Sequence, residues 1–157
     1  MHNRQTLARD AWLEGVGLHT GATVRMRLVP APAESGIVFV RTDRPDVEIP
    51  ATLDHVGPSF YATVLQKNGV TVSTIGHLMA ALYALRIDDV RVELDGPEVP
   101  ILDGSSRCFV EAVEGAGTAE HDVPRLYLTV VRPIVVPHDD KRIGVYPCSE
   151  YKVTYAI

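Results

Sequence analysis

Two hydrophobic periodicities follow one another in Ser73-Thr74-Ile75-Gly76-His77-Leu78-Met79-Ala80-Ala81-Leu82-Tyr83-Ala84-Leu85-Arg86-Ile87-Asp88-Asp89-Val90-Arg91-Val92-Glu93-Leu94-Asp95. The first half repeats apolar residues at the spacing of one helix face: Ile75, Leu78, Leu82 and Leu85. The second half alternates apolar and charged residues, as in a strand with one buried face: Val90, Val92 and Leu94. We predict a helix capped by the hydroxyl of Ser73 or Thr74, followed by a half-buried strand.

Further strands are predicted before this segment. Residues 5–18 are typical of a strand pair, residues 24–28 of a half-buried strand, and residues 37–40 of a short apolar strand. Between residues 41 and 67, prolines interrupt any long element, so a small irregular β-excursion is expected there. Residues 70–72 add one more short strand.

A second helix and a β-rich end are predicted after it. Ser105 or Ser106 would cap the helix, and the apolar stripe comprises Phe109, Ala112, Val113 and Ala116. Gly115 and Gly117 would end it. Alternating residues then predict strands over 126–130, 143–145 and 153–157, with a hairpin turn at Asp139-Asp140-Lys141.

These elements predict an α+β fold. We expect a two-layer sandwich in which a mostly antiparallel sheet carries two helices on one face, plus the small β-excursion. The length of 157 residues fits a single domain over residues 1–157. Because the outer side of the helix layer stays open, we expect a homodimer or another protein partner to cover this helix face and bury Ala81 and Ala84.

The composition excludes several classes of protein. A net charge of −5 disfavours nucleic acid as a partner, because its binding needs clustered Lys and Arg. No apolar run approaches the roughly 20 residues that span a membrane, and no signal peptide is visible. Two cysteines, Cys108 and Cys148, are too few for a disulfide framework and are expected to be buried thiols. We therefore expect a cytoplasmic protein.

Histidines supply the candidate chemistry. His77 falls in the first turn of the predicted helix, where the positive end of the helix dipole favours the neutral imidazole that a metal requires; a capping or packing role is the alternative. His19 lies in the glycine-rich stretch Gly15–Gly21, whose glycines suggest positive φ or close approach to a ligand. Asp103 would orient a site or close a turn. The other candidates are expected on the surface: His55, His121 and His138.

Several blocks of sequence resemble the N-terminal domain of the UDP-3-O-acyl-N-acetylglucosamine deacetylases, the zinc enzymes of lipid A synthesis. They occur in the order and at the spacing of that family: Gly15–Gly21, Pro30-Ala31-Pro32 with Gly36-Ile37-Val38, Arg41-Thr42-Asp43, Ser73-Thr74 with His77-Leu78, Ile87-Asp88-Asp89, and Pro97–Ser105 with Phe109-Val110. The resemblance covers nearly the whole chain.

The resemblance implies two similar domains whose helix layers face each other across the active site. In that family a histidine at the position of His77 is one zinc ligand, and a second domain supplies the others. The glutamate before that histidine is the general base, and here the position is Gly76. The resemblance therefore implies no catalytic residue in this chain alone, zinc only if a partner adds ligands, and a ligand site for a UDP-linked acyl sugar that includes Leu18, His19, Thr63 and Asp103.

Two functions stay open at this point. In the first, the chain is half of a deacetylase and a separate polypeptide completes the site. In the second, it is a non-catalytic domain derived from that enzyme that binds a ligand or another protein in a regulatory role. Gly76 arises by drift, by deliberate substitution, or for anion binding at the helix start.

Overall fold

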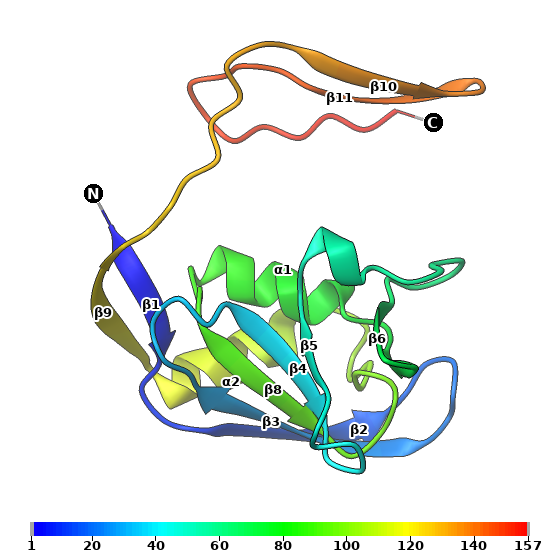
Figure 1. The fold of residues 1–157 in the computed structure, drawn as a ribbon, viewed down its shortest axis with the longest axis vertical. Coiled ribbons are helices and arrows are strands. Elements are labelled where there is room, and N and C mark those ends of the chain that lie inside the picture. The colour runs from blue at the N-terminus through cyan, green and yellow to red at the C-terminus, as the bar shows by residue number, and fades with distance from the viewer. Residues whose placement is uncertain (1, 157) are drawn as a thin grey trace. The chain divides into compact units, whose positions relative to one another are not determined.

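Five strands form the main sheet of the computed structural model, which describes residues 2–156 (Figure 1). In spatial order they are β2 (Ala11–Val16), β3 (Thr23–Pro30), β8 (Val90–Leu94), β4 (Ile37–Arg41) and β5 (Glu48–Pro50). Neighbouring strands are antiparallel except β4 and β8, which are parallel. The predicted half-buried and apolar strands are thus confirmed, as is the mostly antiparallel sheet.

The two central strands bury the residues that alternation selected. In β3 these are Val24, Met26 and Leu28, and in β8 they are Val90, Val92 and Leu94, all fully buried. Met26 lies opposite Leu94 and Leu28 opposite Val92. Each such side chain contributes roughly 1.5–3 kcal/mol on burial, so this double row is a main source of stability.

Both helices, α1 (Gly76–Ala84) and α2 (Arg107–Ala116), lie on the same side of this sheet in Figure 1. Of the predicted stripes, Leu78 and Leu82 of α1 and Phe109, Val113 and Ala116 of α2 are buried, while Leu85 and Ala112 are half-buried; Ala81 is buried as well. The α+β two-layer class is therefore confirmed. Ala81 is only 1% exposed within this core, so the expectation that a partner buries it is wrong; Ala84 is exposed.

The predicted cap of α1 is wrong. Ile75 holds the N-cap position and, within residues 2–156, makes no side-chain cap bond. The hydroxyls of Ser73 and Thr74 donate instead to Pro97 O and Glu98 Oε1. At α2, Ser106 occupies the N-cap without a side-chain bond in the described chain, while Ser105 Oγ accepts the Arg107 N–H at 3.1 Å.

Strand β1 (Asn3–Leu7) pairs with β9 (Thr118–Pro124), whereas β2 pairs with β3. The predicted strand pair within residues 5–18 is therefore wrong. The physical reason lies at Gly117, which ends α2 with a φ of 72° and accepts the Ala8 N–H at 2.9 Å, so that the chain after α2 lies beside β1. Gly115, by contrast, lies inside α2.

The excursion between β4 and α1 is irregular, as predicted. It contains β5, the short 3₁₀ helix η1 (Leu53–His55), and the hairpin of β6 (Leu65–Lys67) and β7 (Val70–Val72). Asn68 and Gly69 turn this hairpin with φ values of 50° and 77°, the left-handed values of a tight two-residue turn.

The chain divides into two compact units, Met1–Arg125 and Leu126–Ile157. In the second, β10 (Ile134–His138) and β11 (Lys141–Val145) form the predicted hairpin around Asp139 and Asp140. The strands predicted at residues 126–130 and 153–156 are absent from this described part, where no partner strand pairs with them; Ile157 lies outside the described residues. Cys148 is exposed, so its predicted burial is wrong. A single domain over the whole length stays a prediction.

Candidate functional site

Three segments meet ahead of α1: the turn Gly15–Gly21, the loop Pro97–Gly104, and the entry Ser73–His77. Backbone hydrogen bonds join them, from Ile101 N to Val16 O at 3.0 Å, from Ser73 N to Pro97 O at 2.9 Å, and from Val99 N to Ser73 O at 3.1 Å. The glycine-rich turn and the helix start, distant in sequence, are therefore neighbours through the loop between them.

Glu98 lies at the centre of this junction with its side chain fully buried. Its carboxylate accepts the backbone N–H groups of His19 at 3.1 Å and Thr20 at 2.9 Å. It also accepts the hydroxyls of Thr20 at 2.8 Å and Thr74 at 2.7 Å. Burial acts to raise the pKa of Glu98, but the hydrogen bonds, led by that from Thr74, outweigh it and lower this pKa below its usual range.

The glycines of the turn serve close approach within the protein itself. A β-carbon at Gly15 would lie 2.9 Å from Leu102 Cδ2, and one at Gly17 would lie 2.5 Å from Glu98 Oε2. Only Gly21 of this turn has a positive φ, at 66°. The stretch that suggested a ligand therefore packs first against its own loop.

Thr74 has a φ of 60°. This left-handed value is uncommon for any residue with a side chain and a true outlier for a β-branched one. Such strain persists where surrounding contacts hold it in place, and it is concentrated at functional sites. Here the Glu98 carboxylate holds the Thr74 side chain directly before α1.

His77 and Gly76 open α1. The His77 ring is half-buried and, among residues 2–156, has no hydrogen-bond partner. Gly76 is exposed, and a β-carbon built on it meets no atom of the described chain within 4 Å apart from its chain neighbours and the nearby backbone of α1. The position can therefore hold a larger side chain, and steric need does not explain the glycine.

The sequence relationships extend over this whole arrangement. A sequence model described as UDP-3-O-acyl N-acetylglycosamine deacetylase matches residues 4–157. The chain belongs to this deacetylase family. The resemblance stated from the sequence blocks is thereby confirmed.

Three curated relatives of the deacetylase family carry the description UDP-3-O-acyl-N-acetylglucosamine deacetylase. The relative from Myxococcus xanthus is 46% identical over 99% of this chain and 50% of its own length. Those from Hahella chejuensis and Solibacter usitatus are each 44% identical, over 100% and 98% of this chain and 52% of their own lengths. The chain thus spans about half the length of the curated relatives it matches.

The donor set of this deacetylase-family chain does not make a zinc site. Within residues 2–156, no group of three His, Cys, Asp or Glu side chains is arranged to hold a metal ion. Zinc sites in proteins use about three or four protein ligands, and His77 alone would supply a single one. Any zinc at His77 would need further ligands from outside these residues.

The other expected ligand residues fall in different places around the junction. Leu18 and His19 are exposed on the turn that Glu98 holds. Thr63 is exposed and lines a cavity of about 300 Å³ together with Ile75 and Met79 at the start of α1. The Asp103 carboxylate accepts the N–H and the hydroxyl of Ser105, each at 2.9 Å, and both bonds lower its pKa. Asp103 thus closes a turn before α2, and its ligand role stays a prediction.

Sequence reasoning missed Glu98 as a site residue. It entered only as one letter of a family block, because a glutamate between two prolines is expected on the surface. The sequence does carry one signal for Glu98: it contains hydrogen-bond donors that need a buried acceptor. These are the hydroxyls of Thr20 and Thr74 and the backbone N–H groups of the glycine-rich turn, and a buried carboxylate can accept from all of them.

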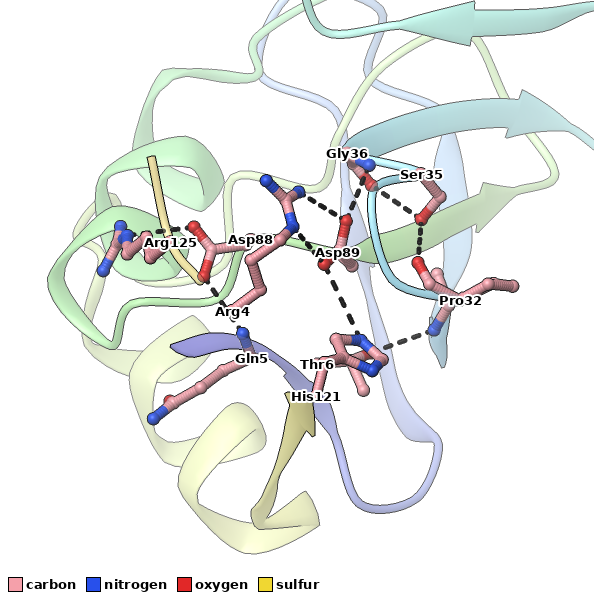
Figure 2. A network of polar contacts seen from close by, with 11 residues as sticks. Arg4, Gln5, Thr6, Pro32, Ser35, Gly36, Asp88, Asp89, His121 and Arg125 are labelled. Carbon is pink, nitrogen blue, oxygen red and sulfur yellow. Dashed lines mark hydrogen bonds and ion pairs between the residues drawn. The ribbon is translucent and has the colours of Figure 1, made fainter. Parts of the chain in front are cut away.

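Of the histidines expected on the surface, His138 is exposed, whereas His55 and His121 are half-buried. His121 of β9 is half-buried, and its Nε2 lies 3.6 Å from Asp89 Oδ2 (Figure 2). Asp89 is fully buried and accepts two bonds from Arg4, at 2.9 and 2.6 Å, and one from Gly36 N at 2.8 Å. The burial of this carboxylate acts to raise the pKa of Asp89, and Arg4 leads the contacts that lower it overall. This cluster ties β1 to the segment before β8.

Neither helix in residues 2–156 combines the length and the apolar character needed to cross a bilayer.

Proposed function

We propose that this chain supplies one half of a site that removes the acetyl group from UDP-3-O-acyl-N-acetylglucosamine, and that it has no turnover alone. Family membership supports the substrate class. The observation that carries the proposal is the junction around Glu98, which presents Leu18 and His19 beside the entry to α1 and His77. His77 would be the contribution of this chain to a metal site whose remaining ligands come from a second polypeptide or domain.

Gly76 is the reason for expecting no turnover. Amide hydrolysis at neutral pH needs a group that accepts a proton from the attacking water, and glycine has none. Loss of a positioned general base costs typically about 10²–10⁴-fold in rate. The exposed position and the open space around Gly76 would allow a glutamate to reach outward from the helix start.

Deacetylation assays with a complementing half test this proposal. The chain is mixed with a separately produced second half of the Myxococcus xanthus relative, and acetate release is measured. We expect background release for the chain alone, weak release in the mixture, and at least about a hundredfold gain with Gly76→Glu. Gly76→Gln is the matched control, because it has the same size without a basic carboxylate. No gain with Gly76→Glu in any mixture would contradict the half-site.

A non-catalytic binding domain is the second candidate. Gly76 favours it, because the chain has the turn Gly15–Gly21 and the Glu98 carboxylate that holds it but has no general base at position 76. Calorimetric titration with UDP-3-O-acyl-N-acetylglucosamine distinguishes the two. Binding by the chain, weakened by His19→Ala, together with background release in every mixture, supports the binding domain. Absence of binding at millimolar concentration rejects its small-ligand form.

A protein partner over the helix layer completes the proposal. Exposed Ala80 and Ala84 of α1 leave little bulk along one strip of its outer face, beside the exposed Tyr83, and another helix layer could approach along that strip. A two-fold homodimer satisfies this, and so does a complementing half. Light scattering at high concentration tests the homodimer, and a monomer contradicts it. The cytoplasmic location expected from the sequence is tested by cell fractionation.

A further inference from the structure

We infer that Glu98 and Thr74 form a positioning pair that fixes the turn bearing Leu18 and His19 relative to the start of α1. Neither residue is proposed to touch a substrate. The consequence for ligand binding rests on the proposed function, whereas the mechanical coupling between the two segments does not.

The first support is the way in which the Glu98 carboxylate is satisfied. The donors to this fully buried group come from two segments: the backbone and hydroxyl of the turn at His19 and Thr20, and the hydroxyl of Thr74. These donors are backbone N–H groups and hydroxyls, and none of them is a cationic side chain. Because buried carboxylates without partners are strongly disfavoured, separating the segments would be costly.

The second support is the conformation of Thr74. Its φ of 60° is strained for a β-branched residue and is not needed for helix formation, since Ile75 already holds the N-cap in a helical conformation. Contacts of Thr74 and of the residue before it hold the strain: the Ser73 backbone is hydrogen-bonded to Pro97 and Val99, and Thr74 Oγ1 donates to Glu98. The strained residue lies three positions before His77, so its conformation sets where α1 begins.

The third support is the close fit at Gly17. The carboxylate occupies the space that a β-carbon would take, so the turn can lie against Glu98 only with glycine at this position. The turn, the carboxylate and the helix entry therefore form one rigid junction. A substitution at Thr74 should therefore change the protection of the His19 and Thr20 amides from hydrogen exchange, although the two segments lie far apart in the sequence.

Amide hydrogen exchange in the full chain tests the coupling without any ligand. Thr74→Val removes the hydroxyl and keeps the branched shape, Thr74→Ser keeps the hydroxyl, and Glu98→Gln leaves one accepting oxygen for donors from two segments. We expect exchange at His19 and Thr20 to rise about tenfold or more in Thr74→Val and Glu98→Gln, and to stay near wild type in Thr74→Ser. If Glu98→Gln does not fold, the comparison of Thr74→Val with Thr74→Ser decides.

Asp89→Asn is the matched control. Asp89 is also a fully buried carboxylate that accepts a backbone N–H, but it lies in the other cluster (Figure 2). A merely general loss of stability would raise exchange at His19 and Thr20 in Asp89→Asn as well, when the variants are compared at equal global stability. Unchanged exchange in Thr74→Val, or an equal rise in Asp89→Asn, would overturn the positioning pair.

Calorimetry with UDP-3-O-acyl-N-acetylglucosamine tests the consequence for binding. We expect affinity to fall about tenfold in Thr74→Val and to recover in Thr74→Ser. Faster amide exchange at His19 and Thr20 together with unchanged affinity would overturn the role in binding. If the wild-type chain binds no substrate at millimolar concentration, the small-ligand form of the binding domain fails, the half-site is still decided by the deacetylation mixtures, and the exchange experiment still decides the coupling.

Discussion

Gly17 lies so close to Glu98 that a β-carbon at position 17 would be 2.5 Å from Glu98 Oε2. The same β-carbon would also overlap the Thr20 hydroxyl, which itself donates to Glu98 at 2.8 Å. The glycine is therefore required by a buried carboxylate, and its φ is not in the left-handed region.

Gly17→Ala should therefore destabilise the chain by about 1–3 kcal/mol, the usual cost of forcing extra volume into a packed site. Urea unfolding followed by circular dichroism measures it. Gly76→Ala is the control, because a β-carbon there meets no atom of residues 2–156 within 4 Å beyond its chain neighbours and the nearby backbone of α1, and alanine favours the helix. Equal stability changes in the two variants would contradict the close fit.

Arg4→Met should cost about 2–4 kcal/mol, because it leaves the fully buried Asp89 carboxylate without its cation. Arg25→Met breaks an ion pair of similar chemistry, but Arg25 and Asp95 are 68% and 34% exposed, so we expect about 0–1 kcal/mol. Urea unfolding of both variants checks the difference. A loss for Arg4→Met no larger than that for Arg25→Met would show that burial does not strengthen this pair.

Local patterns predicted the elements, and long-range partners explain the errors. The stripe of α1 and the alternation of β8 are properties of a few neighbouring residues, so both were predicted correctly. The partner of β1 is β9, more than a hundred positions along the chain, and nothing in residues 5–18 encodes that pairing.

The site was predicted in part for the same reason. His77 was placed correctly at the helix start, but its neighbours Ser73 and Thr74 were assigned as caps because local rules favour hydroxyls there. In the fold their acceptors are Pro97 and Glu98, which come from a loop after β8. A buried acceptor supplied by a distant segment outcompetes a local cap, and periodicity carries no signal of it.

Acid should weaken the junction in a definite pH window. The folded pKa of Glu98 lies below its ordinary value of 4.5, since the hydrogen bonds outweigh burial. A carboxyl with a lowered folded pKa contributes stability that is fully present above the unfolded pKa and is lost as pH falls through the folded pKa. We therefore expect the free energy of unfolding to decline below about pH 4.5.

Glu98→Gln should remove part of this decline and leave the rest, because the pKa of Asp89 is lowered as well. Urea unfolding at intervals from pH 3 to pH 7 measures both curves. The difference between wild type and Glu98→Gln should be largest near neutral pH and shrink on acidification. A difference that is constant across this range would show that the charge of Glu98 does not contribute.

Gly76→Glu should stabilise the folded chain by up to about 1 kcal/mol, whatever its effect on chemistry. Replacing glycine in a helix removes its entropic cost, and a negative charge in the first turn interacts favourably with the helix dipole. Gly76→Gln separates the two effects, since it changes propensity without charge. We expect Gly76→Glu to be more stable than Gly76→Gln by a few tenths of a kcal/mol at low salt, and the two stabilities to converge at about 1 M salt. Destabilisation by Gly76→Glu would mean that the start of α1 is less open than the space around Gly76 indicates.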